Sequence, residues 1–386
     1  MKLGADTKYV GIADNEKLFF ENQFAVPGGF TCNSYVIIDE KCAVIDGVEE
    51  EYLDVWLKNV KKALGDRKPE YLVVLHMEPD HSGSIAAFAE AYPGAKIVSN
   101  PKSFAMMKAF YRFDPGERAV PAPDGYSLSL GKHVLTFTAA PMLHWPEVNV
   151  AYDEFTKTLF SADVFGSFGM PGSGEKWEDE ARRYYFGIVG KYGAQAAGLL
   201  KKLAGKETEL VCPLHGRALA GEELSRALEL YGLWSEYKPE DEKTVIVYSS
   251  VYGNTQSAAM MLAEILEEKG KLADVWDLGE DDAYEAVASA FAHAKLVLAT
   301  TTYNGDVFPL MKDFLNRLAE RGSKDRTVAL IENGSWAPAA ARAMKAFLEE
   351  KCKNVSFCPT QVKILSAMSP ESQQQIETLA DELIGE

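Results

Sequence analysis

The sequence of 386 residues predicts two α/β domains, the second of them a doubly wound parallel sheet. A chain of this length exceeds one ordinary core and is long enough for two. Strand-like and helix-like segments alternate strictly over about the last 140 residues, as in parallel sheets. A charged, proline-containing stretch at residues 234–243 separates this regular part from a less regular one. We therefore expect domains at residues 1–240 and 241–386, joined by a linker.

The composition predicts compact globular domains, because apolar residues make up 47% of the chain and charged residues 25%. No apolar run approaches the roughly 18 residues of a membrane span, and the N-terminus lacks the apolar core of a signal peptide. We therefore expect a cytoplasmic protein that does not enter a membrane.

The formal net charge of −17 argues against nucleic-acid binding, which needs clustered Lys and Arg. This charge suits small substrates and a partner with a basic patch, and it also suits plain solubility. The cysteines form no C-x-x-C pair, which excludes a zinc ribbon, a rubredoxin-type iron site and a thioredoxin motif. The five cysteines are Cys32, Cys42, Cys212, Cys352 and Cys358.

The first domain opens with apolar alternation that predicts two paired strands, at residues 35–39 and 42–46, joined by a short turn. A helical segment follows, then an apolar strand at residues 71–75 and a helix from about Ser82. The pattern predicts further strands at residues 134–139, 148–152, 158–161 and 210–212.

The second domain has a more regular pattern. Predicted strands lie at residues 244–249, 274–278, 296–299, 327–331 and 361–365. Helical segments between them include residues 257–269, 309–321 and 339–350. Parallel sheets of this kind bind ligands in the crevice beyond the carboxyl ends of their strands.

The densest chemical signal follows the strand at residues 71–75. Four potential metal ligands lie within six residues: His76, Glu78, Asp80 and His81. A loop at a strand end can turn alternate side chains into one small volume, and imidazole with carboxylate suits transition metals. A lone His or Asp would be typical of a surface or a helix cap, whereas this spacing predicts a metal site.

Three later residues complete the pattern. His144 lies in a loop between two predicted strands, Asp163 ends a strand, and His215 follows another strand. Each is weak alone, yet four of the six histidines lie in these segments, which leaves only His133 and His293 outside. The order and the types of these residues therefore extend the predicted metal site.

This order of ligands resembles the metallo-β-lactamase-like fold, an αββα sandwich. Its hydrolases usually have His at the third motif position, and Glu78 there is similar to the flavodiiron proteins, or A-type flavoproteins. The resemblance implies two Fe ions per chain. One would be held by His76, Glu78 and His144, the other by Asp80, His81 and His215, with Asp163 bridging.

The chemistry of Glu78 agrees with this resemblance. A zinc site that activates water needs Lewis acidity and no redox change. A carboxylate in place of a neutral imidazole adds negative charge, which favours the ferric state. Zinc also tolerates Glu, so a zinc-dependent hydrolase with a flavodoxin-like regulatory module remains an alternative.

The second domain opens with a strand that ends in a loop of small polar residues and then a helix. Such a loop can bind a phosphate through backbone N–H groups, small hydroxyls and the helix dipole. It has no Lys of the kind that binds a nucleoside triphosphate, and an ordinary turn capped by Thr255 is the alternative. The predicted phosphate-loop residues are Ser249, Ser250, Val251, Tyr252, Gly253, Asn254 and Thr255.

Two more strand-end loops have a similar composition. Tyr303 and Trp336 can flank an aromatic ring system or serve as packing residues. The segment from about Thr244 resembles flavodoxin, which implies FMN, although Val251 and residues 333–336 depart from the commonest family forms. The further predicted FMN residues are Thr301, Thr302, Tyr303, Asn304, Gly305, Asn333, Gly334, Ser335 and Trp336.

The resemblance implies reduction of dioxygen to water, of nitric oxide to nitrous oxide, or both, with electrons passing through FMN to the two irons. The ligands do not discriminate between the two substrates. No rubredoxin or NAD-binding domain follows, so we expect a separate electron donor, with rubredoxin first. The family also implies a head-to-tail homodimer or a dimer of dimers. A third interpretation is a pure electron-transfer protein whose first domain is structural. The seven matched ligand positions argue against it.

Overall fold

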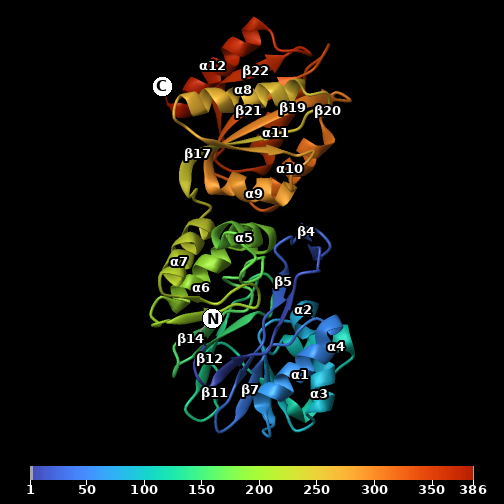
Figure 1. The fold of residues 1–386 in the computed structure, drawn as a ribbon, viewed down its shortest axis with the longest axis vertical. Helices are drawn as coiled ribbons and strands as arrows, with labels where there is room; N and C mark the ends of the chain where they lie inside the picture. The colour runs from blue at the N-terminus through green and yellow to red at the C-terminus, as the bar shows by residue number, and fades with distance from the viewer. Residues whose placement is uncertain (1–2, 386) are drawn as a thin grey trace. The chain divides into compact units, whose positions relative to one another are not determined.

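The computed structural model describes residues 3–385 and divides the chain into two compact units, at residues 1–232 and 233–386 (Figure 1). The predicted domain boundary, between residues 240 and 241, lies directly before β17 (Asp241–Tyr248), the first strand of the second unit. That boundary stays a prediction. None of the helices in residues 3–385 combines the length and the apolarity that crossing a bilayer requires.

In its described residues the first unit contains two six-stranded sheets and two small two-stranded sheets. The first sheet has the order β1 (Thr7–Tyr9), β6 (Tyr35–Ile37), β7 (Cys42–Ile45), β8 (Pro69–Val74), β9 (Lys96–Ser99) and β10 (Ala119–Pro121). The second has the order β11 (Ser127–Ser129), β12 (Val134–Ala139), β13 (Asn149–Asp153), β14 (Thr158–Phe160), β15 (Leu210–Cys212) and β16 (Leu219–Ala220). The remaining pairs are β2 (Ile12–Asp14) with β5 (Phe30–Cys32), and β3 (Phe19–Phe20) with β4 (Phe24–Ala25). The antiparallel pairing of β6 with β7 confirms the first predicted strand pair.

Helices cover the outer faces of these sheets, with α1, α3 and α4 on one side and α6 and α7 on the other (Figure 1). Helix α1 buries Trp56, Val60 and Leu64, which share one helical face at a spacing of four residues. This arrangement confirms the predicted αββα sandwich. The helices are α1 (Leu53–Leu64), α2 (Pro79–Ser82), α3 (Ile85–Ala91), α4 (Ser103–Tyr111), α5 (Trp177–Tyr184), α6 (Gly193–Leu203) and α7 (Gly221–Ser235).

The helix predicted from about Ser82 is α3, and a short helix, α2, precedes it. Short helix α2 begins at Pro79, a residue suited to the first helical turn, and therefore includes two of the predicted metal ligands. The chain then passes close to its neighbours at Gly83, where a Cβ atom would lie 2.8 Å from the backbone nitrogen of Glu50. Helix α3 begins at Ile85, three residues after the predicted start.

The second unit contains a parallel sheet with the order β18 (Ala273–Asp277), β17, β19 (His293–Tyr303), β21 (Thr327–Asn333) and β22 (Ser356–Ile364). Because β17 pairs with both β18 and β19, the strand order reverses between β17 and β19, where such sheets bind ligands. Helices α8 (Asn254–Glu268) and α12 (Pro370–Ile384) pack on one face. The opposite face carries α9 (Ala283–Ala292), α10 (Pro309–Glu320) and α11 (Ala340–Lys351) (Figure 1). The predicted doubly wound sheet is confirmed.

Two predicted boundaries in the second half are wrong. Strand β19 continues to Tyr303, because β20 (Asp306–Val307) folds back onto it and pairs Val307 with Thr302. The predicted linker at residues 234–243 shrinks from both ends. Helix α7 continues to Ser235 and buries Trp234 completely, while β17 already starts at residue 241.

Candidate metal centre and flavin site

Strand β8 delivers the first predicted ligands to the end of the first sheet. Asp46, which follows the neighbouring strand β7, accepts hydrogen bonds from the backbone N–H groups of Leu75 (2.8 Å) and His76 (3.4 Å). This contact fixes the chain where it leaves β8. His76 and Glu78 therefore project from a braced loop, and α2 carries Asp80 and His81 directly after it.

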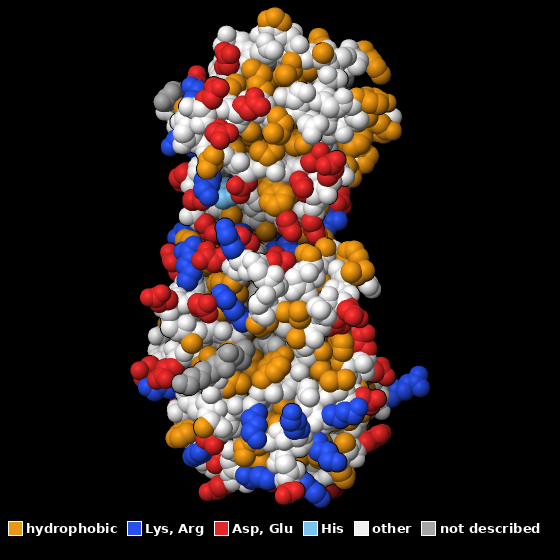
Figure 2. All heavy atoms as spheres, in the orientation of Figure 1, with side chains coloured by type: hydrophobic (Ala, Val, Ile, Leu, Met, Phe, Trp, Pro, Cys, Tyr) orange, Lys and Arg blue, Asp and Glu red, His pale blue; other side chains and the backbone are white. Residues whose placement is uncertain are grey.

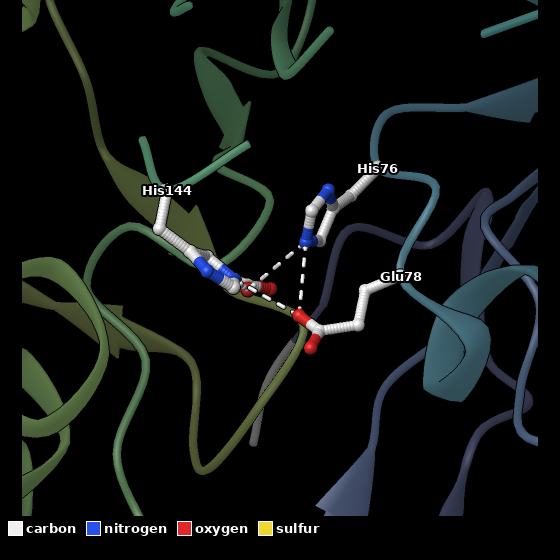
Figure 3. Close-up of side chains that lie close together, drawn as sticks. His76, Glu78 and His144 are labelled. Atoms are coloured by element: carbon white, nitrogen blue, oxygen red, sulfur yellow. Dashed lines mark hydrogen bonds and ion pairs between the residues drawn. The ribbon is translucent and has the colours of Figure 1, made fainter. Parts of the chain in front are cut away.

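One cluster of potential ligands contains His76, Glu78, His144 and Asp163, whose ligand atoms lie within 4.8 Å of one another. The side chains of the first three point toward one another from two separate loops (Figure 3). The Nε2 atom of His144 lies 2.9 Å from Oε2 of Glu78, and Nε2 of His76 lies 3.2 Å from the same oxygen. The structure therefore brings together residues that are up to 87 positions apart in the sequence.

A second cluster contains Asp80, His81 and His215. The Nε2 atoms of the two histidines are 3.0 Å apart, and each lies 3.2 Å from Oδ2 of Asp80. Asp163 faces both clusters. Its Oδ2 atom lies 3.1 Å from Nε2 of His144, and its Oδ1 atom lies 3.3 Å from Nε2 of His81. All seven predicted ligand residues thus lie close together, with Asp163 facing both clusters, and their binding of metal stays a prediction.

The hydrogen bonding of the second cluster fits bound cations. Nδ1 of His215 lies 2.7 Å from the backbone oxygen of Thr31, which can only accept, so Nε2 of His215 carries the lone pair. Both oxygens of Asp80 and Oδ1 of Asp163 are buried and accept no hydrogen bond within residues 3–385. Unpaired buried carboxylates that face an imidazole lone pair are costly, and a metal ion would compensate them. Nitrogen and oxygen donors suit iron or zinc.

The electrostatics of the first cluster point the same way. Burial by itself would lower the pKa of His144, but contacts with Asp163 and Glu78 outweigh it and raise this pKa to about 9. Burial would also raise the pKa of the two carboxyl groups, yet the neighbouring histidines hold each of them below its usual range. The buried carboxylates therefore require positive charge nearby.

Two residues that support the ligands were not predicted. Oε1 of Glu147 accepts hydrogen bonds from Nδ1 of His76 and from the backbone N–H of Met77, both at 2.9 Å. Thr31 supports His215 through its backbone oxygen, as described above. A carboxylate three residues after His144 was a visible signal for Glu147, whereas a backbone carbonyl leaves no signal in a sequence.

The two histidines expected to lie outside the metal site are outside both clusters. Nδ1 of His133 lies 2.8 Å from Asp153. His293, in the second unit, lies between Asp241 and Asp274, at 2.7 and 2.8 Å. Both therefore have structural partners of their own.

The predicted phosphate loop joins β17 to α8. Gly253 has φ +87°, and its N–H donates to Oγ of Ser250 (3.1 Å), which curls the loop ahead of the helix. Within residues 3–385 no side chain caps α8, so its first-turn amides are available to an anion. Ser249 lies at the strand-order reversal, with its Oγ 2.7 Å from Oγ1 of Thr300 on β19. This loop fits an FMN phosphate. The alternative, an ordinary turn capped by Thr255, is wrong because Thr255 lies inside α8 and its side chain does not cap the helix.

Several other predicted FMN residues brace the loops around this edge. The hydroxyl of Thr302 accepts hydrogen bonds from the N–H groups of residues 339 and 340, at the start of α11. The side chain of Asn333 exchanges two hydrogen bonds with the backbone of Ser366 (3.0 and 3.1 Å). Residue 366 belongs to a further loop, after β22, that sequence reasoning missed. Asn304 and Gly305, both with positive φ, form the turn between β19 and β20.

Aromatic side chains at this edge are exposed. Trp336 and Tyr252 are each 92% exposed. Tyr303 is 47% exposed and makes a T-shaped contact with Phe308, with the ring centroids 5.4 Å apart. Figure 2 shows apolar side chains gathered along the edge of the second unit where β19 and β20 lie in Figure 1. Exposure of Trp336 disfavours the packing alternative for this residue, and its contact with FMN stays a prediction.

Comparison with known proteins agrees with both halves of this description. Residues 30–216 match the family model of the ODP family beta lactamase, and residues 246–375 match flavodoxin. The chain is 26% identical to rubredoxin-oxygen oxidoreductase of Megalodesulfovibrio gigas, over 96% of this chain and 94% of that protein. It is 27% identical to nitric oxide reductase of Moorella thermoacetica, over 89% and 87% respectively.

The similarity extends to solved structures. Rubredoxin oxygen:oxidoreductase from Desulfovibrio gigas has a TM-score of 0.90 and 25% identity, covering 99% of this chain and 97% of that one. The flavodiiron protein from Giardia intestinalis has the same TM-score and the same fold, covering 100% and 96%. The fold and site define a β-lactamase-like metal domain followed by a flavodoxin domain. The chain belongs to the flavodiiron proteins.

Proposed function

We propose that this protein is an FMN- and di-iron-dependent oxidoreductase that reduces dioxygen to water, nitric oxide to nitrous oxide, or both. The observation that carries the proposal is the position of Asp163, whose two buried oxygens face separate clusters of His and carboxylate ligands. A single carboxylate shared in this way suits two metal ions close together. Glu78, where hydrolases of this fold usually have His, favours iron over zinc by its negative charge.

Separate groups of side chains would bind the two irons and FMN. His76, Glu78 and His144 would hold one iron, Asp80, His81 and His215 the other, and Asp163 would bridge them. When bound, the irons supply the redox chemistry on the diatomic substrate, and FMN supplies the electrons. The phosphate of FMN would lie at the loop containing Gly253.

The surroundings of the metal site suit small neutral substrates. The ring of His215 is packed by Phe30, Phe20 and Tyr184, with centroids 4.8, 5.4 and 5.5 Å away. His76 and His215 are fully buried. This aromatic wall keeps bulk water away from the ligands, and a diatomic gas needs no dedicated polar group for binding.

The partners follow from the relatives and from the charge. Relatives are named for rubredoxin, oxygen and nitric oxide, so a separate rubredoxin-type donor and both gases belong to the proposal. The net charge of −17 suits a donor with a basic contact surface. A head-to-tail homodimer, or a dimer of dimers, and a cytoplasmic location complete it.

Metal analysis, a visible spectrum and turnover measurements test the function together. We expect two irons and one FMN per chain, with oxygen or nitric oxide consumed when a chemically reduced carrier is supplied. His144→Ala should lose turnover and iron, whereas His133→Ala, outside both clusters, should keep both. Zinc content with hydrolase activity and no reductase activity would refute the proposal.

A further inference from the structure

Glu147 is completely buried, in the segment that leads into β13. One of its oxygens, Oε1, accepts hydrogen bonds from Nδ1 of His76 and from the backbone N–H of Met77. The other oxygen, Oε2, is buried and has no hydrogen-bond partner within residues 3–385. The carboxylate is therefore held against a single metal ligand, with no other side chain to share its charge.

The two metal positions have the same kinds of ligand. Each has two imidazoles, one carboxylate of its own and a share of Asp163. They differ in the groups behind the imidazoles. His215 is supported by the neutral backbone carbonyl of Thr31, and Nδ1 of His81 has no hydrogen-bond partner within residues 3–385. The buried carboxylate of Asp46 lies near His81 but accepts hydrogen bonds from backbone N–H groups, whereas that of Glu147 is hydrogen-bonded to the ring of His76.

This difference has two physical consequences. A carboxylate only accepts hydrogen bonds, so Nδ1 of His76 carries the hydrogen and Nε2 presents its lone pair toward Glu78 and Asp163. The negative charge on the far side of the ring also makes the imidazole a stronger electron donor to a metal. The fixed tautomer and the stronger electron donation both act at the metal position that contains His76.

We infer that Glu147 is a positioning residue that makes the site of His76, Glu78 and His144 the tighter of the two metal sites. The inference rests on the proposed function, since that function assigns a metal to each cluster. It predicts that the two metals of one chain leave separately when a chelator competes for them.

Glu147→Gln tests this inference, because glutamine keeps the size of the side chain and its accepting oxygen but removes the charge. We expect the tighter metal to be released at a chelator concentration about 10–100-fold lower than in the wild type. The other metal should be released as before. In the Mössbauer spectrum of the iron-loaded variant, one of the two iron signals should change and the other should stay.

Asp153→Asn is the matched control. It neutralises the same kind of buried contact, 2.8 Å from Nδ1 of His133, away from both clusters. We expect both metals to be released as in the wild type. If Glu147→Gln weakens both metals equally or neither of them, the inference is wrong. Glu147→Asp, which keeps the charge, should restore the order of release at least in part, and a loss equal to that of glutamine would also contradict it.

A measurement on the wild-type protein covers the case in which the Gln variant does not fold. Nitrogen NMR of the zinc-loaded protein should show His76 binding metal through Nε2, with a strongly hydrogen-bonded Nδ1–H. Binding through Nδ1 would overturn the inference. Release of the two metals is also measurable with zinc, so a protein that takes up no iron would contradict the proposed function and leave this test intact.

Discussion

Replacing Glu78 by histidine tests the residue that separates this site from the hydrolases of the same fold. Oε2 of Glu78 lies 2.9 Å from Nε2 of His144 and 3.2 Å from Nε2 of His76, so the carboxylate is part of the first cluster. Glu78→His exchanges this negative charge for a neutral imidazole. We expect the variant to keep its fold and its FMN, to prefer zinc, and to lose reductase activity.

The magnitude follows from the charge. Oxidation of one iron adds one positive charge, and a carboxylate about 4 Å away stabilises it by about 4 kcal/mol at an effective dielectric constant near 20. Since about 1.4 kcal/mol is a factor of ten, the ratio of ferric to ferrous affinity should fall roughly 10³-fold. For a one-electron couple this raises the midpoint potential by roughly 180 mV. Zinc already outcompetes ferrous iron at nitrogen and oxygen sites, and loss of a hard carboxylate widens that preference.

The assay combines a spectroscopic redox titration of the iron-loaded protein with metal analysis after expression in mixed metals. Glu78→Gln is the control, because it removes the charge without adding an imidazole nitrogen. Both variants should raise the potential, and the histidine variant should take up more zinc. Unchanged potential, iron content and turnover in Glu78→His would show that Glu78 does not influence the bound iron, and the reasoning from its charge would be refuted.

Three further predictions concern the second unit and the metals. Gly253→Pro should lose flavin absorbance but keep both metals, because proline cannot adopt φ +87°. The control Gly253→Ala should lose less flavin, and bound flavin in the Pro variant would contradict the prediction. Burial alone would lower the pKa of His293, but hydrogen bonds to Asp274 and Asp241 raise it. Its stabilisation is therefore complete below the unfolded pKa of about 6.5 and is lost as the pH rises through the raised folded pKa. The melting temperature of the second unit should fall over that range, and His293→Gln should abolish this component in calorimetry. Chelation of the metals should lower the melting temperature of the first unit, where Asp163 loses its cations, and leave flavin absorbance unchanged.

Much of the metal site could be predicted because it depends on local order. The segment from His76 to His81 directly follows a strand, and Asp163 and His215 also follow strands. Strand ends in a layered α/β domain meet at a common edge, so residues placed there come close together. The same reasoning located the phosphate loop between β17 and α8. Composition and alternation were sufficient for the two fold classes as well.

Element ends were less predictable. Residues 301–303 have the composition of a loop, yet they extend β19 because β20 and β21 supply hydrogen-bond partners on both sides. Trp234 lies in a charged, proline-containing stretch, yet it is fully buried at the end of α7 and donates to Glu240 (2.7 Å). In both cases tertiary contacts outweighed local composition.

The sequence by itself determined the order of the domains, the types of the candidate metal ligands and the loop that fits a phosphate. The segment from His76 to His81 and the phosphate loop are each short, and the later ligand positions were recognised because each lies in a loop at a strand end. Only the tertiary structure decided which groups are hydrogen-bonded to the rings of the candidate ligands. Glu147 contacts His76 across 71 positions, and the carbonyl of Thr31 contacts His215 across 184. Contacts over such separations arise from the packing of two sheets against each other, and no periodicity along the chain encodes them.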